Sequence, residues 1–586
     1  MVGEGLKRPS RSRRAAFAIV AASIAAAVIA VYAQVAGHDF VEFDDDLYLL
    51  GNPYLEYGTS LEGFRFALEG RIDVDGGVSR IWQPVTWLSY LVDYQLWGLD
   101  SAGPWLLTNV AWHIAAAWAL LAALTALTGR FGPSAFAAAL FALHPIQVES
   151  VAWASGRRDV LAGFFFCTTL WAYARDARRR DWLSYVLVFA STAACLAAKS
   201  SLVALPCLLL LLDWWPLHRF RPGDTGAGEP LRELLVEKLP LFGLSAAVIW
   251  INLAPVGATA GPWVSDPPFL ERAADGVMAY AATLGRLVWP SGLAIVYPTA
   301  RQQGLPPVSG LVALATGAAL LAVAVLAARA GRPRGCLLTG WLWFLGMLFP
   351  LIGWVPYGLR VMHDRYAYVP MIGIAVAVSF GAADWIARRR VHRTVAIVTA
   401  VATLLACGVV SFQQAAVWRD SLTLFDHALA ATERNAIVHF YRGNTLVGRG
   451  DLAAARGEFE AALAIQPDYA QALQNLGQLQ LRLGNPRRAL PLLERAVALQ
   501  PRWARALTNL AAAQWSSGDR AGALASLRAA VASAPKFVDA LYALAAAQHA
   551  QGDLAAAAAG YREVLRLDPD HAAAQRGLAR LHPQRE

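Results

Sequence analysis

The sequence predicts an all-helical membrane protein, with a polytopic bundle of about eleven transmembrane helices followed by a solenoid of helical repeats. Long apolar runs fill the first 412 residues, with short basic clusters between them. The chain of 586 residues is 57% hydrophobic and 16% charged, whereas soluble domains are roughly 25% charged. Near the C-terminus, prolines recur at one constant spacing, at positions 467, 501, 535 and 569. The first two features predict the bundle and the third predicts the repeats.

The bundle is predicted from apolar runs that approach the roughly 20 residues needed to cross a bilayer as a helix. They lie at 15–35, 104–127, 133–147, 158–175, 182–198, 200–216, 238–256, 308–328, 336–356, 366–387 and 393–412. The first run follows the basic N-terminus 1–14, and it is longer than the apolar core of a usual signal peptide. We therefore expect a retained first helix within a transmembrane domain at 15–412.

The orientation follows from Lys and Arg residues in the short loops, which favour the cytoplasmic side. Basic clusters recur after every second span, at 7–14, 130, 175–180, 218–221, 329–334 and 388–393. This places the N-terminus in the cytoplasm and the repeats outside the cytoplasmic (inner) membrane. These basic loops also account for the net charge of +9, so the charge does not indicate a nucleic-acid partner. Counting the apolar segment 272–292 as a span would reverse the later loops, so we expect it at the membrane surface or re-entrant.

The first outer loop, 36–103, is longer than topology alone requires. Its tryptophans at 82, 87 and 97 predict a helix over 81–97 that lies at the membrane interface. The five cysteines all lie in apolar segments, so they are expected to be small buried hydrophobic residues, with no disulfide framework and no metal site.

The spacing of the C-terminal prolines, about 34 residues, is the period of tetratricopeptide repeats. Glycine marks the turn between paired helices and alanine their closest approach, at Gly450, Gly484, Gly518 and Gly552, and at Ala455, Ala489, Ala523 and Ala557. We expect a linker at 413–433, four repeats at 434–569, and a capping helix and tail at 570–586. Such arrays present a concave groove to a peptide or protein, although a purely structural or dimerising array remains an alternative.

Three consecutive aspartates, Asp44, Asp45 and Asp46, follow the first predicted span. Crowded carboxylates raise one another's pKa, so one of them can accept a proton near neutral pH. They can also bind a divalent cation. The alternative is a solvated acidic turn.

Further polar residues fall in the other predicted outer loops or at the outer ends of spans. Because the topology gathers them on one face, Arg and Lys can hold a lipid phosphate there while a carboxylate meets the sugar that it carries. Salt bridges that fasten the loops together are the alternative. The residues are His144, Glu149, Arg157, Arg158, Lys199, His363, Asp364 and Arg365.

These motifs together resemble the transmembrane and tetratricopeptide repeat-containing O-mannosyltransferases, especially their bacterial relatives. The resemblance covers almost the whole chain, although Gln83, Gln147 and Ser200 depart from the pattern. The motifs are Phe43–Asp46 with Asn52-Pro53, Trp82–Ser89, the stretches His144–Trp153 and Arg157–Val160, Leu209–Pro216, Asp364–Tyr368 and the terminal repeats.

The resemblance implies a glycosyltransferase of the GT-C fold that takes a sugar, such as mannose, from a polyprenyl phosphate on the outer face. The acceptor is then a Ser or Thr hydroxyl of a translocated protein that binds at the repeats. Asp44 and Asp45 match the family's acidic motif as catalytic carboxylates, with Asp46 and Glu149 as supporting acids. The cations that hold the leaving phosphate are then Arg157, Arg158, Lys199 and Arg365. Further candidate site residues are His144, His363 and Asp364.

Two other functions remain open at this point. The first is a non-catalytic membrane scaffold whose repeats recruit partners for envelope assembly. A transporter is the second, and it is weaker because no paired broken helices occur at matching positions of two halves. The chemistry of these residues does not require a metal, although a divalent cation at the aspartates is compatible with it.

Overall fold

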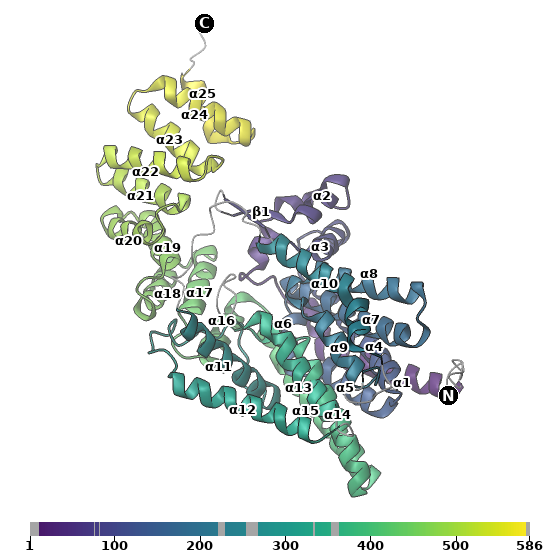
Figure 1. Ribbon diagram of the computed structural model, residues 1–586. Helices are drawn as coiled ribbons and strands as arrows, with labels where there is room; N and C mark the ends of the chain where they lie inside the picture. Colours follow the sequence, from purple (N-terminus) through teal and green to yellow (C-terminus); the bar gives the residue numbers. More distant parts are fainter. Residues whose placement is uncertain are drawn as a thin grey trace.

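The computed structural model describes residues 11–74, 77–80, 82–220, 229–253, 268–331, 335–352 and 362–581. Figure 1 shows a bundle of long helices and a repeat array that extends away from it and carries the C-terminus at its far end. The longer helices of the bundle are α1 (Arg11–Tyr32), α4 (Gly103–Thr128), α5 (Phe131–Leu143), α7 (Arg157–Arg179), α8 (Trp182–Ala198), α9 (Leu205–Trp214), α10 (Leu231–Leu253), α11 (Phe269–Val288), α12 (Gly310–Arg329), α13 (Gly335–Leu348), α14 (Pro370–Arg389) and α15 (Arg393–Val417).

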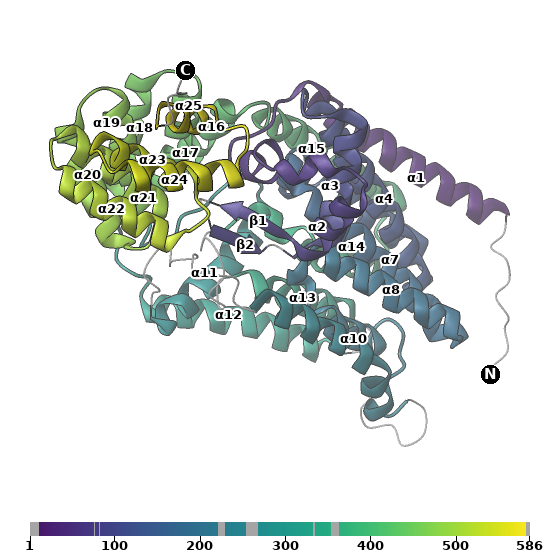
Figure 2. The ribbon, with the colours of Figure 1, turned by 90° about the horizontal axis from the view of Figure 1, so that it is seen from above.

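The predicted all-helical fold is confirmed, apart from one small hairpin in the first outer loop. That loop contains helices α2 (Leu61–Glu69) and α3 (Pro84–Trp97), and strands β1 (Arg71–Val74) and β2 (Gly77–Arg80). The strands pair antiparallel from Arg71 opposite Arg80 to Val74 opposite Gly77. The hairpin lies between the repeats and the bundle (Figure 2), and the sequence analysis missed it. Helix α3 is the helix predicted at 81–97; its first predicted residue, Ile81, lies outside the described residues.

Six helices of the described chain are long and apolar enough to cross a membrane, or seven if the bent pair Phe131–Leu143 and Pro145–Val151, at 52° to each other, forms one span. The six are α1, α4, α10, α12, α14 and α15. Several present apolar side chains outward: in α12, Leu311 is 79% and Leu314 73% exposed. Such surface is stable against lipid but not against water. The predicted total of eleven spans stays a prediction, and α11 is not among the six.

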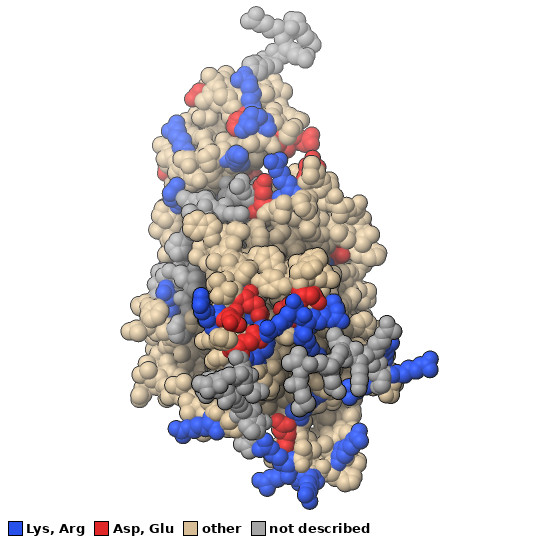
Figure 3. All heavy atoms as spheres, turned by 45° about the vertical axis from the view of Figure 1, so that its right-hand side comes forward, with Lys and Arg blue, Asp and Glu red and all other residues tan. Residues whose placement is uncertain are grey.

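The centre of the bundle is built around α4, which packs along α7 and α5, while α7 packs along α8 and α13 along α14. The α13–α14 pair is close because two glycines face each other. A Cβ on Gly340 would lie 2.3 Å from the Gly373 carbonyl oxygen, so no larger residue fits there. In the view of Figure 3, the charged side chains gather in a few groups with broad uncharged surface between them.

The repeat array consists of four helix pairs and a final helix. The pairs are α17 (Ala436–Gly448) with α18 (Leu452–Ile465), α19 (Ala470–Arg482) with α20 (Pro486–Leu499), α21 (Ala504–Ser516) with α22 (Arg520–Ser533), and α23 (Val538–Ala550) with α24 (Leu554–Leu567); α25 (Ala572–Leu581) follows. Each pair turns at a glycine with φ between 74° and 95°, which favours glycine. The predicted alanines are all fully buried between helices.

The repeats are fastened to the bundle by the segment predicted as a linker. Residues 413–433 are mostly helical, because α15 continues to Val417 and α16 (Ser421–Ala431) follows. Leu424 and Phe425 of α16 belong to the same apolar core as the bundle helices. The Asn435 side chain, just before α17, donates to the Val296 carbonyl oxygen at 3.2 Å. The first repeat is thus held against the bundle and against the loop between α11 and α12.

Candidate functional site

The acidic loop after α1 holds Asp45 in the interior. The carboxylate accepts hydrogen bonds from the Val41 N–H at 3.0 Å and from the Ser155 N–H and hydroxyl at 2.9 and 2.5 Å. Only 1% of the residue is exposed, and burial raises its pKa to about 7 although these donors lower it. Since Ser155 lies just before α7, Asp45 ties the first outer loop to the second.

The neighbouring aspartates point elsewhere. The Asp44 side chain is 22% exposed and pairs with the Arg158 guanidinium at 3.4 Å. Asp46 begins the short helical turn Asp46–Leu50 and is exposed. Asp44 is therefore the carboxylate of this loop that both stays accessible and contacts a cation.

Consecutive arginines at the start of α7 have different environments. Arg157 is fully buried, and its guanidinium donates to Ser89 Oγ at 2.6 Å, to the Trp105 carbonyl oxygen at 2.9 Å and to Asn109 Oδ1. It also forms an ion pair with Asp93 at 2.6 Å. Its position favours a structural clamp between α3, α4 and α7 over the predicted contact with a donor phosphate.

Arg158 points to the other side of α7. Its guanidinium lies over the rings of Tyr48 and Trp153, at 5.7 and 5.9 Å from their centroids. Its side chain is 16% exposed, so it can still reach a ligand.

Lys199 lies between α8 and the short turn Ser200–Leu202. Its ammonium group pairs with Asp159 of α7, whose carboxylate is fully buried. The other oxygen of Asp159 has no hydrogen-bond partner among the described residues. The Tyr366 ring lies 5.9 Å from Lys199 Nζ, so Asp159 and Tyr366 together hold the lysine in place.

Arg365 is fixed by Glu149 from the second outer loop. One oxygen of Glu149 accepts from the Arg365 guanidinium at 2.9 Å and the other from its backbone N–H at 3.0 Å. His363 Nδ1 lies 3.5 Å from the same carboxylate and 2.5 Å from the Ile295 carbonyl oxygen. Glu149 therefore positions the segment that precedes α14.

Arg158, Lys199 and Arg365 form what we call the outer cluster, and two aromatic rings link them. The Arg365 guanidinium lies 4.6 Å from the Trp153 centroid, which Arg158 also approaches, and 5.7 Å from the Tyr366 centroid, beside Lys199. The cations come from three segments far apart in the sequence. Their carboxylate partners are Asp44, Asp159 and Glu149.

His144 and Asp364 are engaged outside the outer cluster. The two ring nitrogens of His144 contact the Leu287 carbonyl oxygen at 2.9 Å and the Ile146 N–H at 3.2 Å. Asp364 accepts from the Tyr297 hydroxyl at 2.8 Å and pairs with Arg286 at 3.0 Å. Burial raises the pKa of Asp364 to about 7. Both residues fasten α11 and the loop after it to the bundle.

A metal centre is not evident in the described part of the chain, because no group of three or more His, Cys, Asp or Glu side chains is arranged to hold an ion. Of the three aspartates that the sequence analysis considered for a divalent cation, Asp44 pairs with Arg158 and Asp45 is hydrogen-bonded to Val41 and Ser155.

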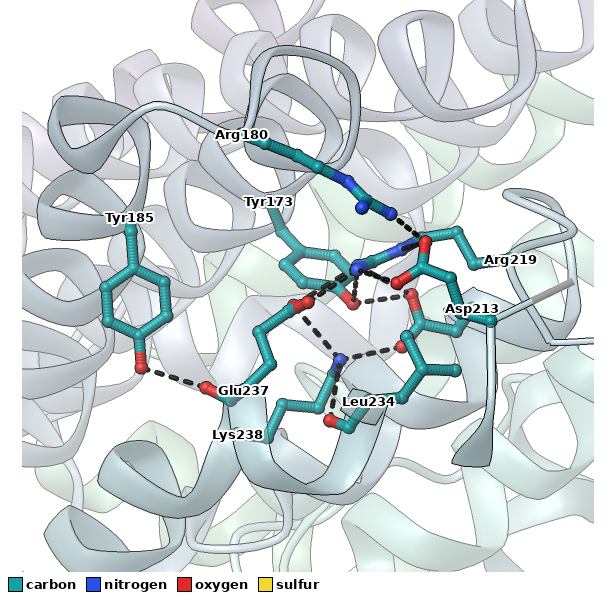
Figure 4. Close-up of polar contacts among 9 residues, drawn as sticks. Tyr173, Arg180, Tyr185, Asp213, Arg219, Leu234, Glu237 and Lys238 are labelled. Carbon is teal, nitrogen blue, oxygen red and sulfur yellow. Dashed lines mark hydrogen bonds and ion pairs between the residues drawn. The ribbon is translucent and has the colours of Figure 1, made fainter. Parts of the chain in front are cut away.

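A second charged cluster, which the sequence analysis did not predict, lies toward the other end of α7. Tyr173 is 15 residues from Arg158, which is about 22 Å along a helix. Asp213 of α9 accepts from the Tyr173 hydroxyl at 2.5 Å and pairs with Lys238 at 2.7 Å. Arg219 pairs with Asp213 at 3.2 Å and with Glu237 (Figure 4). Asp213 and Lys238 are fully buried, so this inner cluster joins α7, α9 and α10.

Similar proteins include several named protein O-mannosyl-transferases. Tmtc1 of Drosophila melanogaster is 34% identical over 141 residues, which are 24% of this chain and 16% of that protein. TMTC1 of Homo sapiens is 25% identical over 538 residues, covering 81% of this chain and 59% of that protein. TMTC1 of Mus musculus is 23% identical over 585 residues, covering 81% of this chain and 61% of that protein. The chain thus spans about 60% of the length of these two mammalian relatives.

Tetratricopeptide repeat models match residues 436–502, 475–536, 508–572 and 551–585. Solved structures that align with the repeats include YrrB, titled a TPR protein with an unusual peptide-binding site, at 25% identity over 26% of this chain and 80% of that one, with a TM-score of 0.24. A thermophilic TPR protein of Thermus thermophilus aligns at 24% identity, covering 31% of this chain and 94% of that one, with a TM-score of 0.25. The resemblance identified from the motifs is confirmed: most of the chain is similar to proteins named O-mannosyl-transferases, and its C-terminal part consists of tetratricopeptide repeats.

Proposed function

We propose that this protein is a multi-pass membrane glycosyltransferase that moves a sugar from a polyprenyl-phosphate carrier to a Ser or Thr hydroxyl of a protein outside the cytoplasm. The similarity to O-mannosyl-transferases over most of the chain supports the general activity. The observation that carries the finer proposal is the placement of Asp44 against Arg158, beside Lys199 and Arg365. A base and a group of cations are the two elements that such a transfer requires.

In the proposed reaction, Asp44 accepts the proton of the acceptor hydroxyl as its oxygen forms a bond to the anomeric carbon. The bond from that carbon to the phosphate oxygen breaks, and the phosphate leaves with the electron pair. The three cations of the outer cluster hold the charge of the leaving group. Asp45 and Glu149 act as positioning residues, because both oxygens of each carboxylate are already hydrogen-bonded.

The test is Asp44→Asn in the full chain, reconstituted in lipid with a polyprenyl-phosphate sugar and a Ser/Thr peptide. Asp44 is partly exposed, so its ion pair contributes only about 0–1 kcal/mol to stability and the variant should fold. Loss of a general base should lower the transfer rate by roughly 10²–10⁴-fold. Asp39→Asn is the matched control, because Asp39 is exposed in the same loop, and it should leave the rate unchanged.

The alternative function, a non-catalytic scaffold that recruits partners through the repeats, makes the opposite prediction. A scaffold needs no base, so the Asp44→Asn protein would act like the wild type, and the wild type would transfer no sugar. Normal transfer by the Asp44→Asn variant would remove Asp44 from the mechanism.

A further inference from the structure

The loop that carries Asp44 is packed against the first helix of the repeat array. Phe43 is the residue before Asp44, and its ring lies 4.6 Å from that of Tyr441 in α17. Phe43 is buried and Tyr441 is half-buried. Aromatic pairs at this separation have a preferred geometry and stabilise a structure beyond the area that they bury. The repeat array therefore contributes directly to the position of the acidic loop.

Two main-chain hydrogen bonds hold the same loop to the segment that leads into the repeats. The Asp39 N–H donates to the Arg419 carbonyl oxygen at 2.9 Å. The Glu42 N–H donates to Ser421 Oγ, at the start of α16, at 3.0 Å. These bonds fix the residues before Asp44, and the Phe43 ring extends the attachment into the first repeat itself.

The Phe43 ring also contacts the aromatic residue that supports the outer cluster. Its centroid lies 5.9 Å from that of Trp153, which is fully buried. The guanidinium groups of Arg158 and Arg365 lie 5.9 and 4.6 Å from the Trp153 ring. A row of aromatic rings therefore connects the first repeat to the cations, in the order Tyr441, Phe43 and Trp153.

The start of α17 is attached to a second part of the site. The Asn435 side chain donates to the Val296 carbonyl oxygen at 3.2 Å. The next residue, Tyr297, donates its hydroxyl to Asp364 at 2.8 Å, and Asp364 directly precedes Arg365. Because α17 is held at its start as well as against the acidic loop, the position of its rings is fixed relative to the base and the cations.

The Tyr441 phenol is neutral at the pH at which a carboxylate acts as a base. Burial raises its pKa well above the usual value, and the phenol of Tyr469 and the carboxylates of Asp44 and Asp46 raise it further. The ring therefore adds no negative charge beside Asp44, and its contribution to the loop is its shape.

We propose that Tyr441 is a positioning residue for Asp44, so that the first repeat is a structural part of the transfer site. Through Phe43, the ring holds the Asp44 carboxylate against the Arg158 guanidinium, where the acceptor hydroxyl has to meet it. This inference rests on the proposed function, because it takes Asp44 as the base. A displacement of about 1 Å at a reacting group can lower a rate roughly 100-fold, so loss of the ring should slow the transfer.

The test measures sugar transfer to a Ser/Thr tripeptide by the full chain in lipid nanodiscs. A tripeptide is only about 10 Å long, so it reports on the transfer site and not on recruitment by the repeats. Tyr441→Ala should lower kcat roughly tenfold to a hundredfold with little change in KM, whereas Tyr441→Phe keeps the ring and should keep the wild-type kcat. Tyr542→Ala is the matched control and should leave kcat unchanged, because it removes a half-buried tyrosine that packs on Tyr561 in the last repeat.

A double variant separates positioning from a general loss of structure. If Tyr441 acts through Asp44, adding Tyr441→Ala to Asp44→Asn should lower the residual rate by less than about twofold, since residues that act together are not additive. A further loss as large as that of Tyr441→Ala alone would overturn the inference. An unchanged kcat in the folded Tyr441→Ala protein would also overturn it.

Hydrogen exchange of the backbone amides of residues 41–50 gives a readout that does not require transfer. Tyr441→Ala should raise their exchange roughly tenfold, and Tyr542→Ala should leave it at the wild-type level. If the loop loosens in this way but the wild type transfers no sugar, the proposed function fails alone. If the wild type transfers sugar and Tyr441→Ala changes neither the exchange nor kcat, this inference fails alone.

Discussion

Replacing Arg157 by methionine should destabilise the protein, whereas the same change at Arg158 should leave it folded and weaken its binding of the sugar donor. Arg157 is fully buried and pairs with Asp93, whose side chain is 5% exposed. Without the arginine, the Asp93 carboxylate remains in the interior with no cation. Arg158 pairs with the partly exposed Asp44, which water can solvate when the cation is removed.

The expected magnitude follows from this difference in burial. Removing one partner of a buried ion pair costs about 3–5 kcal/mol, out of a total stability of about 5–15 kcal/mol. In a soluble domain of about 150–250 residues such a loss lowers the melting midpoint by roughly 6–20 °C, and a clearly lower midpoint is expected here. The ion pair of Arg158 contributes about 0–1 kcal/mol. Its loss should instead weaken donor binding by roughly tenfold to a hundredfold, if it makes a charge-assisted bond to phosphate.

The assay is size-exclusion chromatography of the detergent-solubilised proteins after heating, together with binding of the polyprenyl-phosphate sugar. Arg157→Met/Asp93→Leu is the matched control, because it removes both charges and should recover much of the lost stability. The reasoning is refuted if Arg157→Met melts like the wild type but has lost donor binding. Arg157 would then belong to the donor site, as the sequence analysis predicted.

Two further predictions concern the buried acids. The pKa of Asp364 is raised in the folded protein to about 7, so the folded state holds this proton more tightly than the unfolded chain does. The stability that results is fully present below about pH 4, and it is lost as the pH rises to about 7. Asp364→Asn should therefore flatten the melting temperature between pH 5 and 8, and an unchanged slope would contradict this. At the inner cluster, Lys238→Met should lower the free energy of unfolding by about 3–5 kcal/mol, less the part that Arg219 compensates, because Asp213 is fully buried. The control Arg180→Ala removes a side chain that is 60% exposed, and it should lower the free energy of unfolding by only about 0–1 kcal/mol. Equal melting temperatures of the two variants would show that burial is not the cause.

Periodic features of the fold could be predicted from the sequence because they depend on local repetition. Apolar runs of spanning length predicted helices that the structure contains, and the evenly spaced prolines predicted the helix pairs and the terminal helix. The hairpin of the first outer loop was missed, because strands of four residues carry too little alternation to distinguish them from a loop.

The types of residue at the site were also visible in the sequence, but their roles were not. Neighbours such as Asp44 and Asp45, or Arg157 and Arg158, have identical chemistry and differ only in the direction that the backbone gives them. Asp45 turns inward to the donors of Ser155, and Arg157 turns inward to Asp93.

Motifs and periodicity by themselves thus determined that this is a helical membrane protein with a repeat array, and they predicted a set of charged residues at one face of the bundle. Only the tertiary structure decided which of those charges are neutralised in the interior and which remain accessible. The physical reason is that burial and partner choice depend on contacts between segments far apart in the chain, such as Asp45 with Ser155 and Glu149 with Arg365. No local pattern encodes such a contact, although the free energy of every charge depends on it.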